Sequence, residues 1–132
     1  MSLWWQQLLL VMLGGALGAA GRFWLGGAML RQLGSGIPWG TLAANLAGSF
    51  LAGFIVVWLE NRGPAALYWR AFLIVGVLGG LTTFSALMVE TLLIARSQRS
   101  DLLLGYLDGT LVAGFVLVWA GARLAAMLRP AY

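Results

Sequence analysis

The residues of this chain that could carry out chemistry are polar side chains within long apolar stretches. Thr41, Asn45 and Ser49 recur every four residues, so they form one polar stripe on a helix face. Tyr106 and Thr110 form a similar pair further along. A hydroxyl can bond the carbonyl four residues earlier, but the amide of Asn45 has two donors and two acceptors to satisfy. The stripe can therefore bridge two helices, or it can offer a donor to an anion.

A second polar segment, GGLTTFS at residues 79–85, lies inside the apolar run 71–94. Each glycine costs about 1 kcal/mol relative to alanine in a helix interior, so the adjacent pair favours a break. Carbonyls freed by a break at membrane depth are good ligands for a small cation such as Na⁺. A break would also redirect Phe84, whose positive ring edge can contact an anion. The alternative is a kink held by its hydroxyl groups, with no ligand.

Two of the charged residues within the apolar segments, Arg22 and Glu90, could act on an ion. Arg22 can extend to the nearer membrane interface, or it can face a wet vestibule and raise the local anion concentration. Glu90 is either a pathway residue or an interfacial partner for an arginine. The chain has no histidine and no cysteine, and it shows no paired-carboxylate, triad or metal-ligand arrangement. We therefore do not expect an enzyme.

Four hydrophobic segments must position these residues. Of the 132 residues, 61% are hydrophobic and only 9% are charged, which is typical of an integral membrane protein. Because about 20 apolar residues cross a bilayer, we predict one all-α transmembrane domain over residues 1–132, with its third helix broken at mid-membrane. Its four spans cover about 4–30, 39–59, 71–94 and 102–128.

The ends and charges of these segments indicate a multi-pass protein of the lipid bilayer. The N-terminal MSLWWQQLLL lacks a basic region, so no cleavable signal peptide is expected. The net charge of +4 comes from arginines scattered around the spans. They are better placed to anchor headgroups than to bind nucleic acid, so we expect no nucleic-acid partner.

The arginines that set membrane orientation are evenly divided. Four spans put the N-terminus, the second loop and the C-terminus on one side, with Arg62, Arg70 and Arg129, whereas the other side carries Arg31, Arg96 and Arg99. This gives no positive-inside bias and predicts a dual-topology protein that pairs antiparallel with itself. The alternative is a weak bias that the cell resolves by other means. Small residues four apart, such as Gly14/Gly18 and Gly76/Gly80, allow the helices to pack closely.

Three motifs together resemble the Fluc/CrcB family of fluoride channels. They are GAAGR at 18–22, TLAANLAGSFLAG at 41–53 and GVLGGLTTFSALMVE at 76–90. The resemblance implies an antiparallel, dual-topology homodimer of four-helix subunits in the bacterial inner membrane. It also implies passive, selective export of fluoride through two pores per dimer, around a central structural Na⁺.

The resemblance also implies roles for single residues. Asn45 and Phe84 match pore positions, and Gly79 and Thr82 match positions whose backbone carbonyls bind the Na⁺. Arg22 and Glu90 match vestibule positions. The further polar residues assigned to the pore are Thr41, Ser49, Thr83, Ser85, Tyr106 and Thr110.

Leu87 departs from the family pattern. The family commonly has a second pore phenylalanine three residues after the first, and here that position is leucine. Since leucine has no positive ring edge, the second aromatic contact with the anion is in doubt.

A different class, the small four-helix multidrug or cation transporter, is also a dual-topology dimer of similar size. Its chemistry couples protons to cationic drugs through a glutamate in the first span. Here the first span carries Arg22 instead, which favours the fluoride channel. A non-transporting membrane subunit would leave Asn45 and the GGLTTFS segment unexplained.

Overall fold

The computed structural model describes residues 3–129, and within them it is all-helical, with no strand. The two ends of the predicted domain, residues 1–2 and 130–132, lie outside this part. The elements in order are α1 (Leu3–Leu33), α2 (Trp39–Trp58), α3 (Ala65–Trp69), the π-helix η1 (Arg70–Leu78), α4 (Gly79–Leu81), α5 (Phe84–Arg96) and α6 (Ser100–Leu128).

Four helical stretches are long and apolar enough to cross a membrane: Leu3–Leu33, Trp39–Trp58, Ala65–Arg96 and Ser100–Leu128. The third begins at Ala65, earlier than the predicted residue 71. Pro64 immediately precedes it, and proline is well tolerated at a helix start because the missing N–H would be unpaired there. The interfacial residues Tyr68 and Trp69 are therefore already helical.

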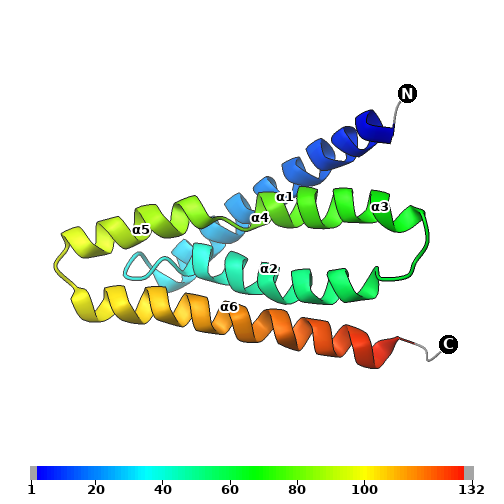
Figure 1. Cartoon of the computed structure of the whole chain (residues 1–132). Helices are drawn as coiled ribbons and strands as arrows, with labels where there is room; N and C mark the ends of the chain where they lie inside the picture. The colour runs from blue at the N-terminus through cyan, green and yellow to red at the C-terminus, as the bar shows by residue number, and fades with distance from the viewer. Residues whose placement is uncertain (1–2, 130–132) are drawn as a thin grey trace.

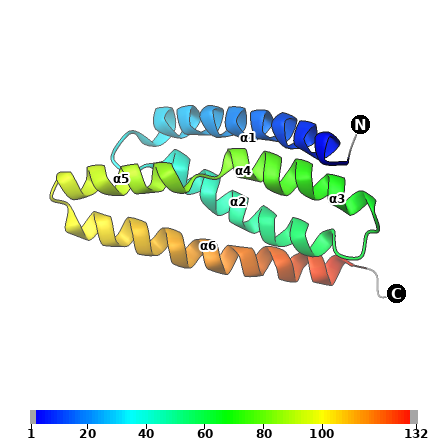
Figure 2. The same cartoon turned by 45° about the horizontal axis from the view of Figure 1, so that its top comes forward.

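The helices run up and down between two ends of the molecule (Figures 1 and 2). The start of α1, the turn after α2 and the end of α6 lie at one end, as expected for four spans. At that end Arg129 forms an ion pair with Glu60 at 3.0 Å, which joins α6 to the turn after α2. The α1–α2 and α5–α6 connections lie at the other end.

Glycines bring the helix backbones into direct contact. A methyl group on Gly18 of α1 would collide with the carbonyl of Val77, and one on Gly80 would collide with the carbonyl of Gly15. In the same way, a methyl group on Gly121 of α6 would collide with the carbonyl of Phe50 in α2. Lipid is as apolar as the helices, so this close packing, rather than exclusion from water, holds them together.

The third span changes its backbone conformation twice. The nine residues of η1 form a π-helix, which the sequence analysis did not anticipate. After the three residues of α4, Thr82 and Thr83 are extended, with φ and ψ of −85° and 153° and of −153° and 118°. Helix α5 then begins at Phe84.

The extended residues lie inside the GGLTTFS segment that the sequence analysis singled out, but not at its glycine pair. It attributed the weak point to the glycine pair at 79–80, but both glycines are helical. Gly80 serves close packing instead, since its backbone lies against α1. The non-helical backbone falls at the two threonines that follow.

Replacing Gly18 with alanine should destabilise the fold by about 1–3 kcal/mol, because α1 must move away from the Val77 carbonyl. Gly27→Ala is the matched control on the same helix, since nothing lies within 4 Å of its added methyl group. Thermal unfolding in detergent, followed by circular dichroism, measures both. Equal melting temperatures for the two variants would contradict the direct backbone contact.

Candidate functional site

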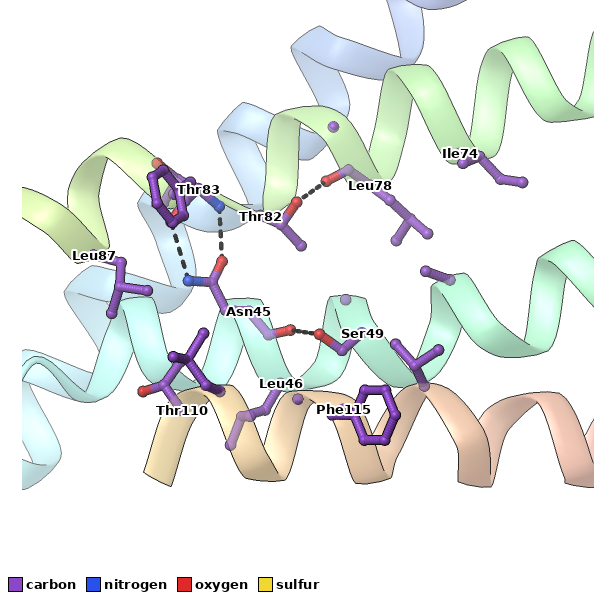
Figure 3. Close-up of a pocket in the computed structure, with 17 residues that line it drawn as sticks. Asn45, Leu46, Ser49, Ile74, Leu78, Thr82, Thr83, Leu87, Thr110 and Phe115 are labelled. Atoms are coloured by element: carbon purple, nitrogen blue, oxygen red, sulfur yellow. Dashed lines mark hydrogen bonds between the residues drawn. The ribbon is translucent and has the colours of Figure 1, made fainter. Parts of the chain in front are cut away.

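An open groove of about 600 Å³ lies between α2, α6 and the extended residues (Figure 3). Most of the residues that the sequence analysis selected line it: Asn45, Ser49, Gly79, Thr82, Thr83, Phe84, Leu87 and Thr110. Thr41 and Glu90 line a smaller cavity of about 260 Å³, and Tyr106 lines another together with Thr110. Arg22 and Ser85 line none of these three. The groove thus gathers residues from three spans beside the non-helical backbone.

Two hydrogen bonds join Asn45 of α2 to the backbone of Thr83. The Asn45 side chain donates through Nδ2 to the Thr83 carbonyl at 3.1 Å, and its Oδ1 accepts from the Thr83 N–H at 2.7 Å (Figure 3). One turn further along α2, Gly48 leaves room for the Thr82 side chain, which a methyl group there would meet. The amide of Asn45 therefore satisfies both backbone groups of an extended residue.

The extended residues interrupt the backbone hydrogen bonds of the third span. In the described chain, no N–H of residues 83–86 donates to a carbonyl of residues 79–82. The Thr83 N–H goes to Asn45, and the Ala86 N–H donates to the Thr83 hydroxyl at 3.2 Å. The carbonyls of Gly79 and Thr82, which these two N–H groups would bond in a continuous helix, lose their usual donors. Such carbonyls can serve as ligands of a small cation.

Arg22 contacts the same segment from α1. Its Nε donates to the carbonyl of Gly80 at 3.1 Å, and the side chain is partly buried. The sequence analysis considered that this side chain extends to the membrane interface or faces a vestibule. Its contact with α4 favours an inward position, which sets a positive charge beside the polar segment and can attract an anion.

Glu90 joins three helices through hydroxyl groups. Thr41 donates to Oε1 at 2.6 Å, and Tyr106 donates to Oε2 at 2.7 Å. These short distances are typical of hydrogen bonds to a carboxylate. The sequence analysis also considered an arginine partner, but the only ion pair among residues 3–129 is that of Arg129 and Glu60.

The two positions matched to pore phenylalanines differ in exposure. The Phe84 side chain at the edge of the groove is 71% exposed, whereas Leu87 is 4% exposed. Leu87 packs with Ile94 and Tyr106, and it also borders the groove. A leucine at this position is therefore part of the core of the chain as well as of the groove wall.

The remaining hydroxyls mostly bond within their own helices. Ser49 donates to the carbonyl of Asn45 at 2.7 Å, and Thr110 donates to the carbonyl of Tyr106 at 2.6 Å. The hydroxyl of Ser85 lies 3.2 Å from that of Thr83. These self-bonded hydroxyls match the structural alternative that the sequence allowed for them, although Ser49 and Thr110 are also among the residues that line the groove.

Sequence reasoning missed one residue and one contact that shape the site. It gave no site role to Gly48, which lies three residues after Asn45 and makes room for Thr82. It also did not connect Arg22 with Gly80, because 58 residues separate them. The only signal in the sequence was that polar or charged residues stand inside apolar spans, at Asn45 and at Arg22.

A family model and individual known proteins both match this chain over most of its length. A family model described as "CrcB-like protein, Camphor Resistance (CrcB)" matches residues 9–122. A protein of Xylella fastidiosa (strain M23) named "Fluoride-specific ion channel FluC" is 56% identical over 125 residues, which are 95% of this chain and 94% of the relative. A protein of the same name in Xanthomonas euvesicatoria pv. vesicatoria is 58% identical over 120 residues, which are 91% of this chain and 90% of the relative. Another in Thermus thermophilus is 44% identical over 123 residues, which are 93% of this chain and 98% of the relative.

Proposed function

This chain belongs to the CrcB-like family, and we propose that it is a fluoride-selective channel through which fluoride leaves a bacterium passively across the inner membrane. The observation that supports this most directly is the groove in which Asn45 and Phe84 lie beside non-helical backbone. The names of its relatives support the choice of fluoride as the ion.

The groove offers an anion weak contacts rather than a full charge. Nδ2 of Asn45 has two hydrogens, and only one of them is used on the Thr83 carbonyl. The exposed ring of Phe84 can add its positive edge. Ser49 and Thr110 can rotate their hydroxyls from their own helices toward the ion. Several weak sites allow an ion to enter and also to leave, as conduction requires.

We propose that two copies pair antiparallel and form two pores. The groove of one copy is open and Phe84 is largely exposed, so a second copy could complete the wall. The even division of arginines supports insertion in both orientations. The two extended threonines would then lie near mid-membrane, inside protein, where non-helical backbone is tolerated.

The chemistry of the polar segment fits a structural Na⁺ held between the copies. The carbonyls of Gly79 and Thr82 have lost their helical donors and border the groove, so they would be its ligands. A bound cation would compensate the partial negative charge of these carbonyls. A multidrug or cation transporter is less well supported, because the inward charge on α1 is that of Arg22.

Purified protein in liposomes should release fluoride, measured with a fluoride electrode, and should not release chloride. Asn45→Asp should slow release about a hundredfold or more, because like charges at about 4 Å repel by about 4 kcal/mol at an effective dielectric constant of about 20. Thr91→Val is the control, since the Thr91 hydroxyl bonds only the Leu87 carbonyl of its own helix. No fluoride release above that of protein-free liposomes would refute the channel.

Antiparallel pairing requires both orientations in one membrane. The chain contains no cysteine, so Ser35→Cys and Ala65→Cys would mark its opposite ends. A membrane-impermeant thiol reagent applied to intact cells should label about half of each variant. Labelling of one variant and not the other would mean a single orientation.

Leu87→Phe should raise the rate of fluoride release several-fold. Leu87 is packed on its core side, so a larger ring has room only toward the groove, where its edge can contact the anion. Leu87→Met is the control, because it fills similar volume without a ring. Equal release by both variants would make the aromatic edge unimportant at this position.

A further inference from the structure

Side chains decide which carbonyls of the polar segment keep a hydrogen-bond donor. Two carbonyls receive one: Gly80 from Arg22, and Thr83 from Asn45. Three others, at Gly79, Leu81 and Thr82, have lost their helical donors, and for two of these the N–H group that would reach the carbonyl is held by a side-chain oxygen. The Thr83 N–H is held by Asn45 Oδ1 at 2.7 Å, and the Ala86 N–H by the Thr83 hydroxyl at 3.2 Å.

The two carbonyls whose helical donors are held by side chains are those of Gly79 and Thr82. In an α-helix each N–H bonds the carbonyl four residues earlier, which pairs Thr83 with Gly79 and Ala86 with Thr82. Backbone donors and acceptors are obligatory hydrogen-bonding groups, so each N–H bonds one acceptor or another. The oxygen atoms of Asn45 and Thr83 are the acceptors that compete with the helix.

We infer that Asn45 Oδ1 and the Thr83 hydroxyl are positioning groups for the cation, which keep the Gly79 and Thr82 carbonyls available by holding the competing N–H groups. The inference rests on the proposed sodium site and deepens it. It gives Asn45 two separable roles, since Nδ2 faces the anion path and Oδ1 holds the backbone. Thr83 acts on the cation through its hydroxyl without touching it.

The test measures sodium binding through protein stability instead of transport. Purified protein in detergent is melted while Na⁺ replaces N-methyl-D-glucamine at constant ionic strength, with tryptophan fluorescence as the signal. A cation that binds only the folded protein raises the melting temperature in step with ln(1 + [Na⁺]/Kd). Fitting this dependence gives the Kd for Na⁺, called the sodium midpoint below because half of the folded protein is loaded at that concentration. General loss of stability in a variant lowers the melting temperature without moving this midpoint.

Thr83→Val should raise the sodium midpoint about tenfold, the effect of one typical hydrogen bond on an equilibrium. Valine favours extended backbone such as that at Thr83, so the variant loses the acceptor and keeps the local conformation. Thr83→Ser restores the hydroxyl and should restore the midpoint. Thr91→Val is the matched control and should leave the midpoint unchanged, since its hydroxyl bonds only its own helix.

Two variants of Asn45 separate its roles. Asn45→Leu removes the acceptor of the Thr83 N–H and should raise the sodium midpoint about as much as Thr83→Val. Asn45→Asp keeps an oxygen at that place, so its midpoint should stay at the wild-type value or fall, although it blocks fluoride release. This contrast would not arise if Asn45 were only a structural residue.

An unchanged midpoint in folded Thr83→Val and Asn45→Leu would overturn the inference, as would a wild-type protein whose stability does not depend on Na⁺. If Thr83→Val is not recovered in folded form, Thr83→Ala is subject to the same expectation. Sodium-dependent stability without fluoride release would leave the inference standing and refute the channel. Fluoride release by a protein whose stability does not depend on Na⁺ would overturn the inference and leave the channel standing.

Discussion

The structure of the site depends on the pair of hydrogen bonds between Asn45 and the backbone of Thr83. Two extended residues inside an apolar span expose backbone groups that lipid cannot satisfy. One amide side chain offers both a donor and an acceptor at the required spacing, and it stands on a helix that approaches closely at Gly48. This contact holds the backbone of Thr83 in place and directs its N–H to Asn45 instead of the Gly79 carbonyl, immediately before α5 begins at Phe84.

Close packing of helices makes that contact possible. The glycines of α1 place its backbone against η1 and α4, and this position brings Arg22 within reach of the Gly80 carbonyl. Helix α2 reaches the segment from the other side through Asn45. Fixed contacts from two helices therefore hold the segment, which explains how three helical residues and two extended ones can persist between η1 and α5.

Composition and spacing were enough to predict four helical spans and a polar stripe on the second, because hydropathy and a four-residue period are local properties. They were not enough to locate the non-helical residues. Glycine propensity pointed to Gly79 and Gly80, but contacts with α1 keep Gly80 helical, and Asn45 stabilises the extended Thr83. The π-helix was also not predicted, because an apolar composition does not distinguish it from an α-helix.

Exposure of a phenylalanine side chain does not by itself identify the site in a chain with membrane-spanning helices. Phe23 is 87% exposed and Phe115 is 67% exposed, similar to Phe84 at 71%, and in a membrane such exposure to lipid carries no cost. Phe84 differs from Phe23 because it lies at the groove that also contains Asn45, and it differs from Phe115, which lines the same groove, because it directly follows the two extended residues. An aromatic edge affects an anion only where polar groups can also replace its water. The combination, and not the ring alone, therefore supports Phe84 as a residue of the proposed fluoride path.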